Sequence, residues 1–590
     1  MKKKIFGGVI LIIMSLLIVI ENAHAAKMQT ENQIDLSGDW KFKLDPEDTG
    51  VKKGWQDTDF DDTGWETVKV PGELPEDYNG VAWYRKNVKA DVSALKKEGA
   101  LALIFQQVDD AAWVYLNGEL VVENHSWNTP FFADITSMIE NKNGKEEFQL
   151  SVRVMDHGGP GGILQPVMLR GVKNAEELYR TKWYGKKPAA TLSEVGDLSM
   201  YSVYTRNFSQ EGTFDALRKR LPEIKSLGID MIWLLPIHPI GEKKRKGEHG
   251  SPYAIKDYYE VSPHIGTKED FRNLVEAAHE HDMKIILDLV LNHTSPDSVL
   301  AEKHPDWFIQ DEEGNPRAEN EDWWDVVDLD WENKKVWEYC AEMMEYWVKD
   351  LDIDGYRCDV ADLMPDDFWK MSIARLEKIK PDVLMLAEST SPRQHLNGFD
   401  ITYNESLYDT AVSVCNGGLP ATALQHACLA AKYGYPENAP RLLFVENHDK
   451  PRAMTAFGGP ERVKLASVLT ATLPGIPLLY TGTEVGADPD RDKTFFVKSP
   501  VDFSKDKHGM RAFYTMLLAL KETRPELKYG DLILLDAEPK DKVFAFERRK
   551  DNHRSLIIMN FSEEETEVRL KHDLMPTGTM VLGRWSWCIF

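Results

Sequence analysis

Cysteine is scarce in this chain, with five residues among 590. None precedes Cys340, so no cysteine near the N-terminus is available to carry a lipid. The five cysteines show neither the even count of a disulfide framework nor the close spacing of a metal site. We expect them to be buried and to pack as small hydrophobic residues. They are Cys340, Cys358, Cys415, Cys428 and Cys588.

Positive charge is also in short supply. The chain has 71 lysine and arginine residues against 96 aspartate and glutamate residues, a formal net charge of −25 at pH 7. Such a surface repels nucleic acid and anionic membranes, so the composition excludes nucleic acid as a partner and favours a neutral or cationic one. The basic run 243–246 is expected to be a solvated face.

Long apolar runs are nearly absent, and the one at the N-terminus has a specific context. Three lysines precede residues 5–20, and Ala23-His24-Ala25 follows. A basic start, an apolar run and small residues predict a secretory signal peptide over residues 1–25. Because the run is long, an uncleaved membrane anchor is the alternative. We expect a secreted protein, extracellular or periplasmic, that meets a membrane only through this segment.

The length of 590 residues requires more than one domain. Over residues 34–173 the sequence shows short segments with the alternating pattern of β-strands, separated by turn residues. This pattern predicts a β-sandwich. Residues 196–525 alternate strands with amphipathic helices, which predicts a (β/α)₈ barrel with a third-strand loop subdomain at 294–332. Residues 526–590 return to short strands and predict a small C-terminal β domain. The overall fold class is therefore α/β with flanking β domains.

Expected barrel strands lie at 200–206, 231–235, 284–291, 354–359, 383–388, 401–403, 442–446 and 477–480. Expected helices lie at 214–227, 268–281, 334–349, 365–379, 421–431, 461–472 and 509–521. Polar clusters follow four of these strands. Each polar group at a strand end costs desolvation unless it is paired or functional, so four such ends favour an active site. The clusters contain Asp288, Asn292 and His293, then Arg357 and Asp359, then Glu388, then Glu446 to Asp449.

Arg357 and Asp359 stand two residues apart on one predicted strand. Their side chains therefore point the same way, and the guanidinium can hold the carboxylate ionised as a nucleophile. A purely structural ion pair is the alternative interpretation. Three carboxylates in one pocket are what glycoside hydrolysis with retention requires, because a nucleophile, an acid/base and a stabiliser are needed.

These motifs, in this order, resemble those of the α-amylase superfamily (glycoside hydrolase family 13). The resemblance covers residues 201–590 and includes YTRNFSQEGTF, GIDMIWLLPIHPIG, HGSPYAIKDYY, DLVLNH, VVDLD, GYRCDVAD, MLAES, FVENHD and GIPLLYTGTEVG. Residues 36–171 resemble the galactose-binding-like jelly-roll domain of β-galactosidase-type hydrolases. That domain implies a carbohydrate context, although such domains are often structural.

The superfamily resemblance implies roles for particular residues. Asp359 would be the nucleophile, Glu388 the general acid and base, and Asp449 the ligand of the 2- and 3-hydroxyls of the distorted sugar. Considered one at a time, His293, His448 and Tyr253 would each be interpreted as core residues. Only the whole set of polar residues favours a sugar-binding site. The implied substrate-binding residues are Arg357, His293, His448, Tyr253 and Asp288.

The resemblance also implies a structural calcium ion bound by Asn292 and Asp328, since oxygen ligands suit calcium. No organic cofactor is expected. The chain departs from many starch-degrading members after the nucleophile, where Asp362 and Leu363 replace a Lys-His pair, so leaving-group binding must differ. Three tryptophans of the third-strand loop are either glucose-stacking platforms or packing anchors: Trp323, Trp324 and Trp331.

The sequence predicts a secreted retaining α-glucan hydrolase, an α-amylase acting on α-1,4 bonds of starch or maltooligosaccharides. A cyclomaltodextrinase, neopullulanase or 4-α-glucanotransferase is the alternative within the class, because all use one covalent intermediate. A non-catalytic carbohydrate-binding or transporter-associated barrel is the alternative from another class. Retention of Asp359, Glu388 and Asp449 favours the enzyme. Bond preference, endo or exo action and oligomeric state stay open.

Overall fold

The computed structural model describes residues 33–590 apart from 76–77, 125–130, 137, 140–145, 157, 159–160, 174, 190–194, 321–322 and 489–495. The chain divides into two compact units, residues 1–180 and 181–590. The predicted signal peptide lies outside the described residues, so its prediction is untested. In the described part of the chain, no helix is both long enough and apolar enough to span a bilayer.

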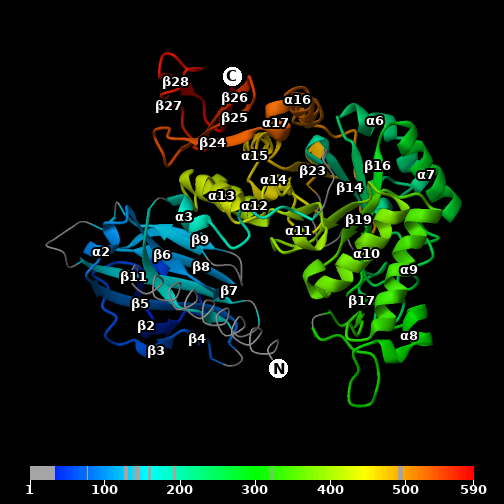
Figure 1. The fold of residues 1–590 in the computed structure, drawn as a ribbon, viewed down its shortest axis with the longest axis horizontal. Helices are drawn as coiled ribbons and strands as arrows, with labels where there is room; N and C mark the ends of the chain where they lie inside the picture. Colours follow the sequence, from blue (N-terminus) through cyan, green and yellow to red (C-terminus); the bar gives the residue numbers. More distant parts are fainter. Residues whose placement is uncertain are drawn as a thin grey trace, which may run out of the picture. The chain divides into compact units, whose positions relative to one another are not determined.

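The first unit is a β-sandwich (Figure 1). One sheet has four strands in the order β1 (Gln33–Asp35), β13 (Val167–Val172), β6 (Ala100–Phe105) and β10 (Phe131–Asp134). The other has six, in the order β3 (Glu66–Val70), β2 (Gly38–Leu44), β5 (Gly80–Ala90), β11 (Glu146–Asp156), β8 (Ala111–Leu116) and β9 (Glu119–Asn124). A small third sheet joins β4 (Gly72–Glu73), β12 (Gly162–Ile163) and β7 (Val108–Asp109), and two short helices, α2 (Ser93–Lys96) and α3 (Ala175–Tyr179), complete the unit.

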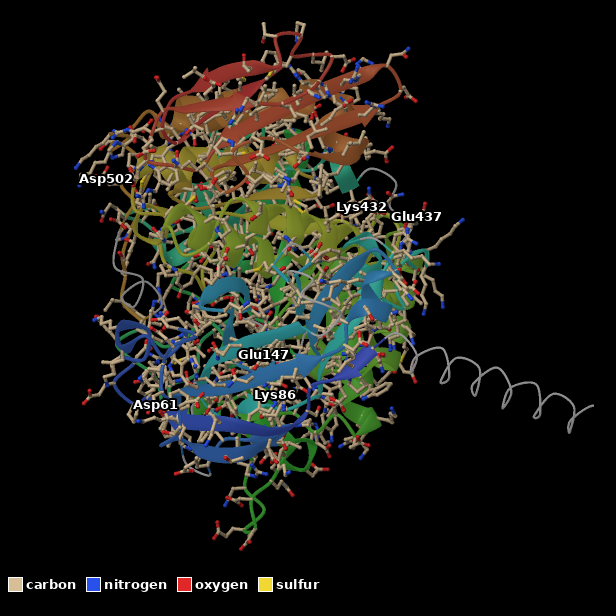
Figure 2. The ribbon with its side chains drawn as sticks, turned by 90° about the vertical axis from the view of Figure 1, so that its left-hand side faces the viewer. Asp61, Lys86, Glu147, Lys432, Glu437 and Asp502 are labelled. Atoms are coloured by element: carbon tan, nitrogen blue, oxygen red, sulfur yellow. The ribbon has the colours of Figure 1, made fainter. Side chains whose placement is uncertain are left out.

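The side chains of β11 alternate between the core face of the six-stranded sheet and its opposite face. Leu150, Val152 and Val154 are fully buried in the sandwich core. Arg153, on the opposite face, is held by the carboxylate of Asp48 at 2.9 and 2.7 Å. Successive side chains of a strand point to opposite faces, so this period of two fixes which residues enter the core. Figure 2 labels charged residues of this sheet, Lys86 on β5 and Glu147 on β11.

The second unit contains a closed barrel of eight parallel strands, as predicted. The strands are β14 (Met200–Val203), β15 (Met231–Leu234), β16 (Lys284–Leu289), β19 (Gly355–Cys358), β20 (Leu384–Ala387), β21 (Ile401–Tyr403), β22 (Arg441–Phe444) and β23 (Ile476–Tyr480). Gly355 opens β19 with φ +150°, and a β-carbon there would lie 1.9 Å from the Leu384 carbonyl oxygen. Only glycine allows the neighbouring backbone to approach so closely.

Helices cover the outside of the barrel (Figure 1). The predicted helix 214–227 is two helices, because Pro222 lacks the amide needed to continue the first and stands at the start of the second. A helix at Glu405–Cys415, α12, was not predicted. The helices are α4 (Thr205–Phe208), α5 (Phe214–Arg218), α6 (Leu221–Ser226), α7 (Lys268–Glu280), α8 (Val299–Lys303), α9 (Lys334–Asp350), α10 (Asp366–Ile379), α11 (Gln394–Asn397), α12, α13 (Thr422–Tyr433), α14 (Ala453–Ala456), α15 (Pro460–Thr472), α16 (Met510–Thr523) and α17 (Pro525–Tyr529).

The C-terminal β domain shares the core of the barrel. Its main sheet joins β24 (Asp531–Leu535), β25 (Val543–Lys550), β26 (His553–Asn560) and β29 (Ser586–Ile589), and β27 (Thr566–Arg569) pairs with β28 (Thr579–Leu582). Phe544 and Phe546 belong to the barrel's hydrophobic core, whereas the intervening Ala545 packs in a smaller core under the second pair of strands. The sheet therefore connects two cores through its two faces.

Candidate active site

Arg357, on β19, lies at the centre of the polar groups at the carboxyl ends of the barrel strands. Its Nη1 lies 2.8 Å from the Oδ1 atoms of both Asp288 and Asp359. Its Nη2 lies 2.7 Å from Oε1 of Glu388, and its Nε donates to the Tyr403 hydroxyl at 3.2 Å. One fully buried guanidinium thus holds three carboxylates together.

Asp288, on β16, lies behind the site. Its side chain has no exposed surface, and its second oxygen accepts hydrogen bonds from Trp233 Nε1 and the Tyr253 hydroxyl, both at 3.1 Å. Arg357 is likewise fully buried. Neither side chain reaches solvent, so both are placed to position other groups. Substrate binding by Asp288 and Arg357 stays a prediction.

Glu388 follows β20 and is held by an unusual backbone conformation next to the predicted nucleophile. The amide of Val360 donates to Oε2 of Glu388 at 2.7 Å. Val360 has φ 38°, a left-handed conformation that costs a β-branched residue roughly 1–3 kcal/mol. This strained turn directly after Asp359 aims the amide at Glu388, and one side-chain oxygen of each acid is fixed by Arg357.

His448 and Asp449, after β22, meet the tyrosine of the second-strand loop. His448 Nε2 lies 2.6 Å from the Tyr253 hydroxyl and 3.0 Å from Oδ2 of Asp449. The Tyr253 and His448 rings stack at a centroid distance of 5.8 Å. The exposed fraction of the side chain is 1% for His448 but 42% for Asp449, so the carboxylate is the group of this pair that is open to solvent.

The three predicted catalytic acids have exposed side-chain surface, whereas Arg357 and Asp288 have none. The side chains of Asp359, Glu388 and Asp449 are 10%, 25% and 42% exposed. Arg357 and Asp288 are fully buried. The structure thus brings the three acids together at one end of the barrel, and these acids, rather than their partners, are the groups that a ligand can reach.

His293 and Asn292 follow β16 at β17 (His293–Thr294), which pairs with β18 (Val327–Asp328). Burial, together with the charge of Lys246, lowers the pKa of His293 to about 4, so its ring is neutral at neutral pH. Its ring also packs edge-on against Trp323 at 5.4 Å. A neutral imidazole can still donate and accept hydrogen bonds.

The proposed calcium ligands are adjacent. Asn292 Nδ2 lies 3.4 Å from Oδ1 of Asp328. Two oxygen-bearing side chains supply only part of the six to eight ligands that calcium takes. Among the described residues, no group of three or more His, Cys, Asp or Glu side chains is placed to hold a metal ion. Calcium binding stays a prediction.

Burial and like charges raise the pKa of two acids in this cluster. Burial raises the pKa of Asp359 well above its ordinary value, Glu388 raises it further, and Arg357 opposes both. Burial raises the pKa of Asp288 to about 6. The raised pKa values belong to Asp359 and Asp288, so at these two acids removal from water, which favours the protonated form, outweighs the attraction of the Arg357 guanidinium.

Two side chains near the site differ from expectation. Asp362 accepts hydrogen bonds from Ser389 Oγ and Gln394 Nε2, both at 2.7 Å, so it ties the fourth-strand loop to the fifth-strand loop.

Lys246 was expected to be a solvated residue of the basic run. Its Nζ instead lies 2.7 Å from the carboxylate of Asp325, whose side chain is only 5% exposed. A buried acid needs such a partner.

Some supporting residues could not be found from the sequence. Trp233 and Tyr403 sit in ordinary apolar strands, and only the closed barrel shows that both reach the Asp288–Arg357 pair. Val360 gives no signal either, since a valine is not expected at positive φ.

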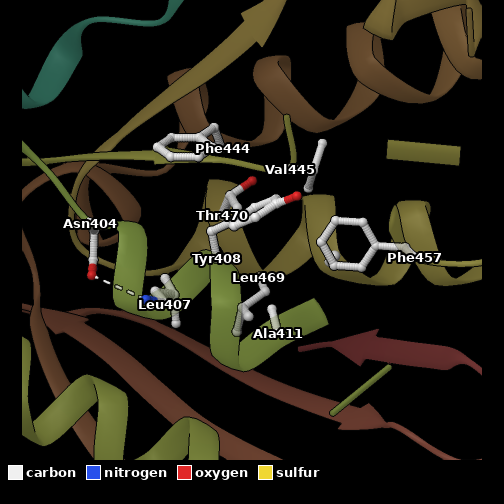
Figure 3. Close-up of a pocket in the computed structure, with 10 residues that line it drawn as sticks. Asn404, Leu407, Tyr408, Ala411, Phe444, Val445, Phe457, Leu469 and Thr470 are labelled. Carbon is white, nitrogen blue, oxygen red and sulfur yellow. Dashed lines mark hydrogen bonds between the residues drawn. The ribbon is translucent and has the colours of Figure 1, made fainter. Parts of the chain in front are cut away.

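A small cavity lies apart from these groups, between β22, α12 and α15 (Figure 3). Asn404, Tyr408 and Thr470 are among the residues that line it, and its volume is about 10 Å³. The amide of Leu407 donates to Asn404 Oδ1 at 3.4 Å across one wall. Such a volume holds one water molecule at most, so the cavity belongs to the core.

A closed (β/α)₈ barrel with three partly exposed acids at the carboxyl ends of its strands defines a barrel enzyme that uses carboxylate chemistry. Comparison with known proteins narrows this class. The model of the α-amylase catalytic domain matches residues 198–513. The chain therefore belongs to the α-amylase family of glycoside hydrolases, as the sequence motifs predicted.

Individual relatives agree with this assignment. An α-amylase of Haloarcula japonica is 30% identical over 412 residues, covering 67% of this chain and 59% of the relative. A cyclomaltodextrinase of Thermoanaerobacter pseudethanolicus is 28% identical over 422 residues, 67% of this chain and 69% of the relative. The crystal structure of an α-amylase from Lactobacillus plantarum superposes with a TM-score of 0.62 at 31% identity, covering 68% of this chain and 99% of that structure.

Proposed function

We propose that the protein is a secreted, retaining α-glucan hydrolase that cleaves α-1,4 bonds of starch or maltooligosaccharides. The observation that carries the proposal is the shared ion pairing of Asp359 and Glu388 with one guanidinium, that of Arg357. Retention needs a nucleophile and an acid/base close together on opposite sides of one glycosidic bond. The basic, apolar and small-residue segments of residues 1–25 support export.

The residues perform two displacements in this proposal. The Asp359 carboxylate attacks the anomeric carbon while Glu388 donates its proton to the departing glycosidic oxygen. Glu388, now ionised, then takes a proton from water, and this water displaces Asp359 from the sugar. Asp449 accepts hydrogen bonds from sugar hydroxyls, which tighten as the ring distorts. Tyr253 packs under the cleaved sugar, while His293 supplies a neutral ring to its hydroxyls.

A cyclomaltodextrinase is the second candidate. The observation that favours it is the Asp362–Leu363 pair after the nucleophile, where Asp362 is occupied by Ser389 and Gln394 and Leu363 is 55% exposed. An exposed leucine at this position presents an apolar surface, and not a charged surface, to the leaving group. The cyclomaltodextrinase relative supports the same candidate.

The test is product analysis of the mature chain on soluble starch, pullulan and β-cyclodextrin. We expect maltooligosaccharides from starch, with the Asp359→Asn variant losing at least a thousandfold in rate because the nucleophile is gone. The preferred polymer separates an amylase from a cyclomaltodextrinase. A wild-type chain that cleaves none of the three would refute the proposal. Asp367→Asn, at an exposed acid of α10 that pairs with Lys370, serves as a control for the loss of one charge.

A further inference from the structure

Glu446 is an acid of the strand-end clusters that takes no part in the proposed reaction. It lies two residues after the end of β22 and is 1% exposed. Nη1 of Arg452 lies 3.2 Å from its Oε1, and the amide of Ala453 donates to its Oε2 at 2.6 Å. A carboxylate so deeply buried needs such partners. Glu446 thus joins the start of the segment 446–453 to its end.

The end of the eighth strand holds the same ion pair. The hydroxyl of Thr483, in the 3₁₀ helix η6 (Thr483–Val485), donates to Oε1 of Glu446. The guanidinium of Arg452 lies over the ring of Tyr480, the last residue of β23, at 4.5 Å from its centroid. Since β22 and β23 are neighbours in the barrel, both partners of the pair are fixed between two strand ends. The ends of the segment cannot separate without breaking buried contacts.

Asp449 lies inside this closed segment. Oδ1 of Asn447 accepts hydrogen bonds from the amides of Asp449 and Lys450, both at 2.9 Å. Such a turn sets the direction in which the backbone presents the residue that follows. The side chain of Asp449 is 42% exposed, whereas Glu446 and Asn447 are each 1% exposed. The exposed carboxylate is therefore carried by a short segment whose own contacts are buried.

We propose that Glu446 and Arg452 are positioning residues, whose ion pair closes the segment 446–453 and so fixes the place of the Asp449 carboxylate in the site. This inference rests on the proposed function, because it concerns how the same site holds the distorted sugar. A contact that tightens in the transition state helps most when its acceptor is already in place. Displacement of Asp449 would therefore slow the reaction more than it weakens substrate binding.

The experiment is a double-mutant cycle of Glu446→Gln with Asp449→Ala. It measures kcat and KM on an activated aryl maltoside, on which slow variants still give measurable rates. Glutamine keeps the size of the side chain but removes the charge that pairs with Arg452. We expect Glu446→Gln to lower kcat about tenfold and to change KM less than about threefold. In the Asp449→Ala background it should change kcat less than about threefold, because the group that it positions is gone.

Glu547→Gln is the matched control. Glu547, on β25 of the C-terminal β domain, is also 1% exposed, and its carboxylate pairs with Arg554 at 2.7 Å. Both glutamine variants leave a buried arginine with less charge to pair with, so both should lower the melting temperature. Only Glu446→Gln should change kcat.

Thr483→Val is a milder variant, which tests the same ion pair if Glu446→Gln does not fold. It removes one hydrogen bond from Glu446 and leaves Arg452 paired. We expect kcat to fall about threefold, the scale of one hydrogen bond, and again only when Asp449 is present.

Equal losses of kcat with and without Asp449 would show that the pair does not act through this acid, and would overturn the inference. Unchanged kcat in both Glu446→Gln and Thr483→Val would overturn it as well. Either result leaves the proposed hydrolase intact. A wild-type chain that cleaves neither the aryl maltoside nor starch would instead overturn the proposed function, and the inference with it.

Discussion

Arg357 determines how the acids of the site share their charge. Its two terminal nitrogens contact Asp288, Asp359 and Glu388, so removing one acid frees the guanidinium to serve the others. This arrangement was partly predictable, because the spacing of Arg357 and Asp359 on one strand required them to point the same way.

The raised pKa of Asp359 predicts the pH dependence of the reaction. The nucleophile must be ionised, so activity falls as pH drops through its folded-state pKa, which lies above the ordinary aspartate value. We expect the acid limb of kcat/KM to lie above the ordinary pKa of an aspartate. Asp288 contributes to this shift, hence Asp288→Asn should move the acid limb to lower pH. The measurement is kcat/KM against pH for both proteins.

Asp367→Asn is the control for this experiment, since Asp367 carries the same charge on α10 and its side chain is 84% exposed. Its profile should match that of wild type. An active Asp288→Asn enzyme with an unmoved acid limb would show that Asp288 does not set the pKa of the nucleophile. Circular dichroism of the variants establishes that the comparison is made on folded protein.

Helices and strands of the barrel followed the sequence closely where periodicity was strong. Asn333 caps α9 through a bond from the Lys335 amide at 3.1 Å, and the predicted range 334–349 differs from the observed end by one residue. The prediction of a single helix over residues 214–227 failed, because Pro222 separates α5 from α6. The sequence analysis also missed α12, which begins at the Asn404 cap.

Lys521, on α16, is a buried cation that links this helix to the end of α15 and to α17. Its Nζ donates to the carbonyl oxygens of Gly475 at 3.1 Å and Leu527 at 3.3 Å. Burial nevertheless lowers its pKa to about 7. The carbonyls favour the charged form, but removal from water opposes it more strongly.

This lowered pKa predicts a pH-dependent stability. Between pH 7 and about 10.5 the unfolded chain binds a proton at Lys521 that the folded chain has lost, so this lysine makes the protein more stable as pH rises. We expect the melting temperature of wild type relative to Lys521→Met to increase from pH 7 to pH 9. Lys380→Met is the control, because ion pairs with Asp354 and Asp352 raise the pKa of Lys380. An offset for Lys521→Met that does not change with pH would contradict this assignment.

The family and the barrel were predictable for the whole molecule because the motifs occur in a fixed order at the ends of predicted strands. The order of the motifs does not predict which loops, distant from one another in sequence, are in contact. Lys246 and Asp325 are an example, since their pairing depends on how the second- and third-strand loops pack together. Domain boundaries at 173 and 526 likewise stay predictions, although the described chain divides after Arg180 and the C-terminal sheet shares the barrel core.

The central claim is that Asp359 and Glu388 act in two displacements that retain configuration at the anomeric carbon. The most direct measurement is proton NMR of the first products released from a maltooligosaccharide, recorded before mutarotation. The account predicts that the new reducing ends appear as the α-anomer and only later equilibrate. Initial appearance of the β-anomer would mean inversion by a single displacement, and Asp359 could not then be the nucleophile.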